Sequence, residues 1–253
     1  MTVATVHFTS RALERSVPYT AFIPNPAIVG PGPYPVLVQL HGYLDDHRAW
    51  SLKSRLWEYV ERLPLIVVMP SGENGFWCNI IPSLRYEDMV VSDLQAHVRA
   101  TLPAREGPWA IGGLSMGGYG AVLLGLKHPE TFCSIFAHSS VLPDPDGPAR
   151  RHFIWARPEL APKVRQALRT DLSVYHWARQ LAPEQRPRLS FDCGTEDGLI
   201  DSNRAFHAFL GQIGYEHTYA EHPGGHTWAY WDLHVQTALR QHCEVLGIEQ
   251  AAA

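Results

Sequence analysis

Residues 111–121 read Ile-Gly-Gly-Leu-Ser-Met-Gly-Gly-Tyr-Gly-Ala, and this stretch decides the fold. The pattern Gly113-x-Ser115-x-Gly117 lies inside it, after a predicted strand and before a predicted helix. Such a turn strains the serine backbone, and a Cβ on either glycine would collide with neighbouring main chain. The helix N-terminus behind the serine stabilises negative charge. The stretch therefore predicts a nucleophile elbow that presents Ser115 as a reactive serine.

Two other interpretations of the same glycines are less consistent with the sequence. A glycine-rich turn that only packs a helix needs neither a serine at its centre nor a strand before it. A phosphate-binding loop needs a Gly-Lys-Ser or Gly-Lys-Thr ending, and none follows these glycines.

Short apolar runs alternate with longer amphipathic stretches along the rest of the chain. Val36–Leu40 and Leu65–Met69 are almost continuously apolar, which is typical of strands buried on both faces of a parallel sheet. Between Tyr86 and Leu102, apolar residues recur at helical spacing. This order predicts an α/β fold, with a mostly parallel sheet and helices on both faces, in a single domain over residues 1–253. The other predicted strands are Val3–Phe8, Val17–Ile23, Trp109–Gly112, Phe132–Ala137, Arg188–Cys193 and Glu216–Glu221, and the other predicted helices are Ser115–His128, Ser202–Ile213 and Trp228–Leu246.

A reactive serine needs a base, and the base needs an orienting acid; in this architecture the acid precedes the histidine along the chain. The acid is expected in the loop after the Arg188–Cys193 strand. Asp197 is the predicted residue because it lies past the turn at Gly194. Glu196 is the near alternative. Asp192 falls within the strand and is expected to point elsewhere, and Asp201 is expected to cap the next helix.

The base is expected between the last strand and the last helix. His226 follows two glycines that let its loop fold close to the elbow, and it is the predicted base. His217 and His222 are interpreted as packing or surface residues. A zinc site built from these three histidines would have spacings of five and four residues and no nearby cysteine, which matches no standard ligand pattern, so no metal is expected.

Ester hydrolysis also needs donors for the oxyanion of the tetrahedral intermediate. One predicted donor is the backbone N–H of Met116, the residue after the nucleophile. The second comes from the loop after the Val36–Leu40 strand, where Gly42 allows the chain to turn. The N–H of Tyr43 is the predicted donor, with Leu44 as the alternative.

Aromatic residues gather in the loops where a substrate pocket is expected. Trp77 and Trp228 are the predicted pocket residues, because Trp77 lies in a glycine-rich loop and Trp228 follows the base by two positions. The other aromatic residues that gather in this region are Tyr43, Trp50 and Phe76. The alternative is that these rings only pack the core, as tryptophans commonly do.

Composition excludes several classes of protein. The 253 residues are 45% hydrophobic and 18% charged, which is too apolar for a disordered chain. A net charge of −4 argues against a nucleic-acid partner. No apolar run approaches the ~20 residues of a membrane helix. No basic and then apolar segment opens the chain, so we expect no signal peptide and a cytoplasmic location. The four cysteines lie far apart, without the spacing of a zinc ribbon or a disulfide scaffold.

The segment Pro143–Arg188 differs from the rest of the chain. It holds nine of the 21 basic residues and five of the 25 acidic ones, so it is locally positive. It predicts short helices joined by prolines, inserted between two strands. The functional interpretation is a helical cap over residues 143–188 that shapes the pocket, and the alternative is a solvated helical surface.

Four motifs follow one another along the chain: Leu40-His41-Gly42, Gly113 to Ala121, Cys193-Gly194-Thr195-Glu196-Asp197, and Gly224-Gly225-His226-Thr227-Trp228-Ala229-Tyr230-Trp231. Together they resemble the esterase D family of α/β-hydrolases, which includes S-formylglutathione hydrolases, short-chain carboxylesterases, feruloyl esterases and mycolyltransferases. The resemblance covers the chain from about Tyr34 to Leu246. It implies the α/β-hydrolase fold, Ser115, Asp197 and His226 as the catalytic triad, and no cofactor. Leu114 stands where S-formylglutathione hydrolases usually have histidine.

The function we expect is that of a serine carboxylesterase acting on a small-molecule ester with a short acyl or an aryl group, through an acyl-enzyme on Ser115. Within the same family, the alternatives are a thioester hydrolase that acts on S-formylglutathione and an acyltransferase. An alternative of another class is a non-catalytic binding protein on a hydrolase fold.

Overall fold

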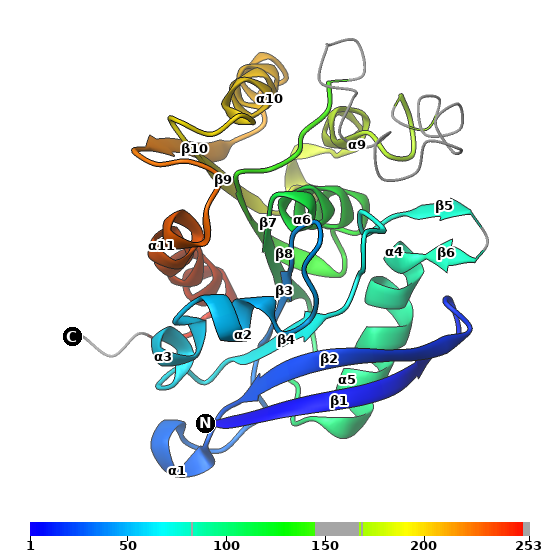
Figure 1. Ribbon diagram of the computed structural model, residues 1–253, viewed down its shortest axis with the longest axis vertical. Coiled ribbons are helices and arrows are strands. Elements are labelled where there is room, and N and C mark those ends of the chain that lie inside the picture. Colours follow the sequence, from blue (N-terminus) through cyan, green and yellow to red (C-terminus); the bar gives the residue numbers. More distant parts are fainter. Residues whose placement is uncertain (82, 145–166, 168, 250–253) are drawn as a thin grey trace.

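In the computed structural model, which describes residues 1–81, 83–144, 167 and 169–249, a twisted eight-stranded sheet runs through the molecule (Figure 1). Its order is β1-β2-β4-β3-β7-β8-β9-β10. Strands β1 and β2 form an antiparallel hairpin that joins β4 antiparallel, and all the later neighbours pair in parallel. The mostly parallel sheet predicted from the sequence is therefore confirmed.

The elements have the following bounds. The strands of the large sheet are β1 (Thr2–Ser10), β2 (Arg15–Ile23), β3 (Val36–Leu40), β4 (Ile66–Pro70), β7 (Trp109–Leu114), β8 (Phe132–His138), β9 (Arg188–Gly194) and β10 (His217–His222), and a small hairpin pairs β5 (Asn79–Ile81) with β6 (Leu84–Arg85). The helices are α1 (Pro26–Val29), α2 (Ala49–Lys53), α3 (Leu56–Val60), α4 (Tyr86–Asp88), the π-helix η1 (Met89–Leu94), α5 (Gln95–Thr101), α6 (Met116–Lys127), α9 (Val174–Gln180), the 3-10 helix η4 (Pro183–Gln185), α10 (Ile200–Gln212) and α11 (Trp228–Leu246).

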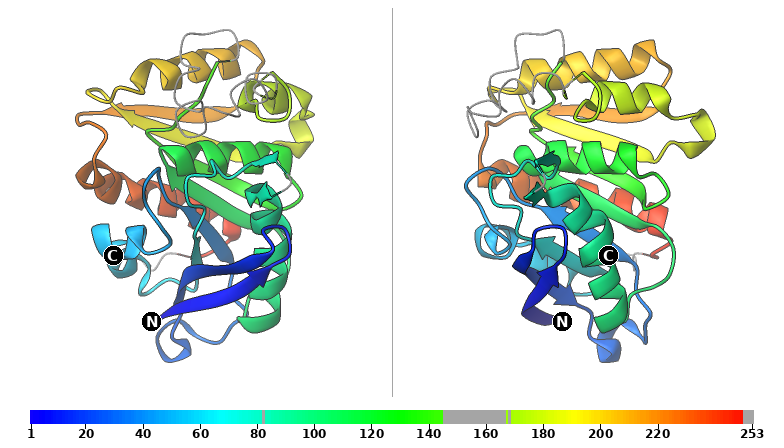
Figure 2. Two further views of the ribbon diagram at one scale, coloured as in Figure 1. Left: turned by 45° about the vertical axis from the view of Figure 1, so that its right-hand side comes forward. Right: turned by 90° about the vertical axis from the view of Figure 1, so that its right-hand side faces the viewer.

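Helices cover both faces of the sheet, and two hydrophobic clusters lie between the layers (Figure 2). On one face, α5, α6, α9 and α10 pack over a large cluster. On the other, α2, α3 and α11 enclose a smaller one. Strands β3, β4 and β7 are buried at every position, which explains their almost continuously apolar sequence.

The neighbouring parallel strands end level with one another at their carboxyl ends. Leu40 of β3 lies opposite Gly113 of β7, Leu114 opposite His138 of β8, and His138 opposite Asp192 of β9. Loops that leave this edge therefore start side by side, although their residues lie far apart in the sequence. This is the edge of an open α/β sheet where ligands bind.

Several predicted elements need correction. The helix predicted between Tyr86 and Leu102 exists, but its middle turn, η1, is wound as a π-helix. The short helices α2 and α3 and the β5–β6 hairpin were not predicted. Most of the predicted cap, residues 145–166 and 168, lies outside the described residues. The described remainder forms α9 and η4, and α9 packs against α6 and α10. None of the described helices combines the length and the apolar character needed to cross a membrane.

Candidate active site

Ser115 lies in the sharp turn between β7 and α6, as the elbow motif predicts. Its backbone has φ of 54° and ψ of −115°, in the left-handed region that a non-glycine residue rarely adopts. The flanking glycines allow this turn: a Cβ on Gly113 would come within 2.5 Å of the Gly117 carbonyl oxygen, and one on Gly117 within 2.5 Å of the His41 carbonyl oxygen. The turn places Ser115 at the N-terminus of α6, whose dipole favours a developing negative charge.

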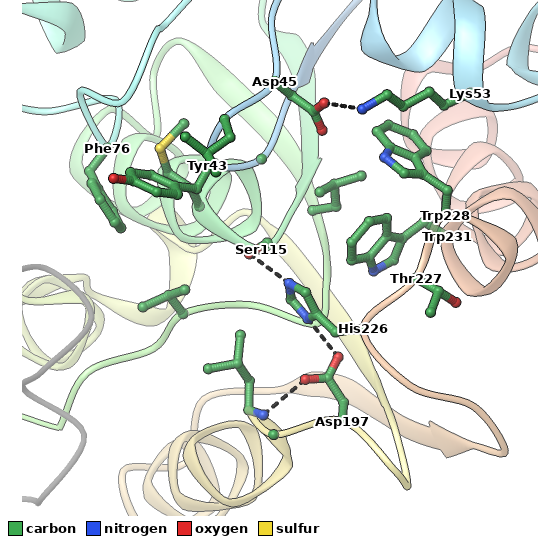
Figure 3. Close-up of a pocket in the computed structure, with 17 residues that line it drawn as sticks. Tyr43, Asp45, Lys53, Phe76, Ser115, Asp197, His226, Thr227, Trp228 and Trp231 are labelled. Carbon is green, nitrogen blue, oxygen red and sulfur yellow. Dashed lines mark hydrogen bonds and ion pairs between the residues drawn. The ribbon is translucent and has the colours of Figure 1, made fainter. Parts of the chain in front are cut away.

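Ser115, His226 and Asp197 form a continuous chain of hydrogen bonds (Figure 3). The Ser115 hydroxyl donates to His226 Nε2 at 3.0 Å, and His226 Nδ1–H donates to Asp197 Oδ2 at 2.8 Å. The other oxygen of Asp197 accepts the Leu199 amide at 2.9 Å. These distances lie within the range for general-base activation of a nucleophile.

Asp197 is buried, and its charge depends on its partners. Burial alone would raise the pKa of its carboxyl group, but the hydrogen bond and charge of His226 and the Leu199 amide outweigh burial and lower it. The carboxylate is therefore ionised at neutral pH and can accept the Nδ1–H of His226.

The loops that carry the acid and the base are locked to each other through their main chains. The Thr195 amide donates to the His222 carbonyl at 2.9 Å, and the Glu196 amide donates to the Gly224 carbonyl at 2.9 Å. At Gly194 the two loops approach so closely that a Cβ would overlap the Gly224 carbonyl group. Thr227 then caps α11 by accepting the Tyr230 amide, which fixes the helix start just after His226.

We expect Gly194→Ala to destabilise the protein by about 3 kcal/mol, because the added methyl group must push the two loops apart. Gly198→Ala is the matched control in the same loop, since a Cβ there meets no atom within 4 Å and its backbone φ is not positive. The free energy of unfolding of each variant is measured by urea denaturation. Equal stabilities for the two variants would contradict the close packing of these loops.

The alternative acids and histidines lie elsewhere. Glu196 is exposed, and Asp192 is buried against His138. His217 bonds to His207, and His222 stacks on His234 with ring centroids 4.2 Å apart. The described residues contain no group of three or more His, Cys, Asp or Glu side chains arranged to hold a metal ion. Of the candidates weighed from the sequence, the structure brings only Asp197 and His226 to Ser115.

The loop after β3 brings main-chain groups next to Ser115. A Cβ on Gly42 would lie 2.6 Å from the Leu114 side chain and 3.6 Å from Ser115 Cβ, so a larger residue here would have to displace the Leu114 side chain. The Leu44 amide already donates to Asn74 Oδ1 at 2.9 Å, which disfavours it as an oxyanion donor. Tyr43 and Met116 both line the cavity at Ser115.

His41 braces the Tyr43 loop from inside, a role that sequence reasoning missed. Its Nε2 accepts the Gly72 amide at 2.9 Å, so its Nδ1 carries the proton and donates to the Gly42 carbonyl at 2.8 Å. Burial lowers the pKa of His41, which keeps the ring neutral and able to accept that amide. The Leu40-His41-Gly42 motif indicated that His41 lies in this loop, but the Gly72 amide that it binds lies in a loop distant in sequence.

A cavity of about 760 Å³ opens above Ser115, as Figure 3 shows. Trp228 and Trp231 form one wall, with the Trp231 ring edge-on to His226 at 4.9 Å. Beside Trp228, the Lys53 ammonium pairs with the Asp45 carboxylate and lies 5.5 Å from the centre of the Trp228 ring. The cavity therefore combines apolar walls with one ion pair, a set of groups typical of a small-molecule site.

The prediction of Trp77 as a pocket residue is wrong. Its side chain is fully buried and does not line the cavity. Glycines at 72 and 120 leave the room that the indole fills, since a Cβ on Gly120 would lie 2.5 Å from it. Trp77 packs edge-on against His41 at 4.9 Å and so supports the loop from behind. Phe76, the residue before it, lines the cavity instead.

The sheet topology, the level carboxyl ends and the strained serine at the strand–helix turn define an α/β-hydrolase fold. The family model described as "Putative esterase" matches residues 10–242. The chain therefore belongs to the Esterase family, which confirms the resemblance drawn from the four motifs. An "Acetyl esterase" of Caldicellulosiruptor saccharolyticus is 30% identical over 216 residues, which cover 80% of this chain and 81% of that protein.

Solved structures share the fold over nearly the whole length. An S-formylglutathione hydrolase from Staphylococcus aureus superposes with a TM-score of 0.84 at 20% identity, covering 94% of this chain and 97% of the other. An S-formylglutathione hydrolase from Agrobacterium tumefaciens gives a TM-score of 0.82 at 23% identity, covering 96% and 95%. At these identities the likeness establishes the fold, and the substrate has to be argued from this chain's own residues.

Proposed function

We propose that this esterase is a serine carboxylesterase that cleaves small esters with short acyl groups through an acyl-enzyme on Ser115. The observation that carries the proposal is the hydrogen-bonded chain from Ser115 through His226 to Asp197, placed on the wall of a cavity. Membership in the Esterase family and the relative named an acetyl esterase support a short acyl group.

Each residue has a defined role in the proposed reaction. His226 Nε2 takes the hydroxyl proton as Ser115 Oγ attacks the ester carbonyl carbon. Asp197 keeps the proton of the imidazole on Nδ1 and stabilises the imidazolium. The amides of Tyr43 and Met116 donate to the oxyanion, a contribution worth about 10²–10³ in turnover for each donor. His226 then protonates the departing alcohol, and it later activates the water that releases the acid.

The residues that line the cavity indicate which substrates the proposed enzyme prefers. Tyr43 and Phe76 lie on one side of the cavity, whereas Lys53 and Trp228 lie on the other (Figure 3). Val141, which is apolar and donates its amide to the Ser115 carbonyl, lines the cavity beside the serine. The proposed enzyme therefore accepts a small apolar acyl group and tolerates polar groups elsewhere on the substrate.

A panel of esters tests the proposed substrate class. We expect kcat/KM to be highest for p-nitrophenyl acetate and butyrate, and at least about tenfold lower for p-nitrophenyl octanoate, because each misfit methylene in a pocket changes discrimination severalfold. The panel includes S-formylglutathione, since the same acyl-enzyme chemistry serves a thioester. A kcat/KM for S-formylglutathione well above that for the acetate would replace the carboxylesterase assignment with the thioester one.

A further inference from the structure

Three buried polar side chains from β8, β9 and α11 meet near the carboxyl ends of these strands, and none of them lines the cavity. His138 at the end of β8 places its Nδ1 2.9 Å and 3.0 Å from the two carboxylate oxygens of Asp192 on β9. Tyr230 on α11 donates its hydroxyl to the same carboxylate at 3.1 Å. We refer to His138, Asp192 and Tyr230 as the buried trio. The reaction proposed above gives these residues no chemical step.

A buried carboxylate of this kind contributes little net stability. Removing the charge from water costs several kcal/mol, which its hydrogen bonds only offset. Burial and the charge of Asp192 raise the pKa of Tyr230, so its hydroxyl stays protonated and remains a donor. The buried trio therefore matters less for stability than for the positions of the chain segments that it joins.

The main-chain carbonyl groups of His138 and Asp192 hold the segments around Ser115 in place. The His138 carbonyl accepts the Ser115 amide at 2.9 Å, and the Asp192 carbonyl accepts the Ser139 amide at 2.8 Å. After Ser139, which has a left-handed φ of 46°, the Val141 amide donates back to the Ser115 carbonyl at 3.2 Å. Both peptide groups of the strained serine are thus tied to the segment that His138 begins.

Asp192 is also connected to the loops that carry the acid and the base. Asp192 lies on the strand that leads into the Asp197 loop, so its position fixes where that loop starts. Tyr230 lies one helical turn after His226, and its ring packs against Gly224, where a Cβ would come within 3.0 Å of the ring. One buried side chain therefore connects the segments that carry the nucleophile, the acid and the base.

We propose that Asp192, held by His138 and Tyr230, is a positioning residue that sets the approach of His226 to Ser115. This inference rests on the proposed function of the triad. Nothing in the buried trio touches the reacting atoms, so it acts on the rate through geometry. Displacements of about 1 Å at a catalytic group cost up to about 10²-fold in rate, which gives the scale of the effect.

Tyr230→Phe tests the proposal with the least disturbance, because it removes one hydroxyl and keeps the ring against Gly224. The matched control is Tyr215→Phe, which removes another buried hydroxyl, bonded to the Pro187 carbonyl at 3.0 Å and outside the cavity. We expect Tyr230→Phe to lower kcat for p-nitrophenyl acetate about tenfold with KM nearly unchanged, and to slow fluorophosphonate labelling of Ser115 by the same factor. Tyr215→Phe should keep wild-type values of both at a comparable melting temperature.

The outcomes separate this inference from the proposed function. Wild-type kcat and labelling rate in Tyr230→Phe, or an equal loss of both in Tyr215→Phe, would overturn the positioning role. Asp192→Asn should lower kcat further where it folds, and Tyr230→Phe decides the question where it does not. If Ser115→Ala keeps its turnover, the proposed function fails instead, whatever Tyr230→Phe does.

Discussion

Replacing Ser115 with alanine is expected to lower kcat for p-nitrophenyl acetate by at least about 10⁴-fold, because the Ser115 hydroxyl is the nucleophile that His226 activates in the proposed reaction. The effect should fall on kcat and leave the fold intact, since the methyl group of alanine fits where Cβ of the serine already lies. The left-handed backbone at this position is set by its glycine neighbours and persists in the variant.

Steady-state kinetics and circular dichroism on the purified variant check this result. Ser16→Ala, a substitution of an exposed serine on β2, is the control and should keep wild-type kinetics. If Ser115→Ala retained more than about a tenth of the wild-type kcat, another nucleophile would have to carry the reaction.

Asp197→Asn is expected to lower kcat by about 10³–10⁴-fold while preserving the shape of the site. The carboxylate accepts from both His226 Nδ1 and the Leu199 amide, and an asparagine has only one oxygen to offer. If its amide group turns toward His226, it donates to Nδ1 and forces the ring proton onto Nε2. The imidazole then has no lone pair with which to receive the Ser115 proton.

Glu196→Gln provides the comparison for this prediction, because Glu196 is the neighbouring acid that the sequence left as the alternative. Its side chain is exposed, and we expect its removal to change kcat by less than about twofold. The two variants are compared at saturating substrate over a range of pH. A larger loss in Glu196→Gln than in Asp197→Asn would reverse the assignment of the acid.

The central strands and the closing helix were predictable because their signals are local. Val36–Leu40 is apolar except at Gln39 and forms β3 with those bounds, and the amphipathic stretch Trp228–Leu246 forms α11 with those bounds. The elbow was equally clear, since a strained turn between strand and helix restricts the residue types around Ser115. In each case the physical requirement falls on consecutive residues.

Features built from distant residues could not be predicted in the same way. Trp77 is buried because two glycines, Gly72 before it and Gly120 far after it in the sequence, leave space for its ring. The sequence indicated that Asp192 points away from the acid loop, but its pairing with His138 and Tyr230 depends on strand register and on the placement of α11. The bracing of the Tyr43 loop by His41 likewise needs the Gly72 amide.

The most direct test of the central claim is mass spectrometry of the protein after reaction with a fluorophosphonate. We predict one phosphonyl adduct, located on the peptide that contains Ser115, formed rapidly by the wild-type protein and at least about 10²-fold more slowly by His226→Ala, because the serine is then without its base. A protein that hydrolyses esters but carries the adduct on another residue, or that labels at the same rate without His226, would contradict the account.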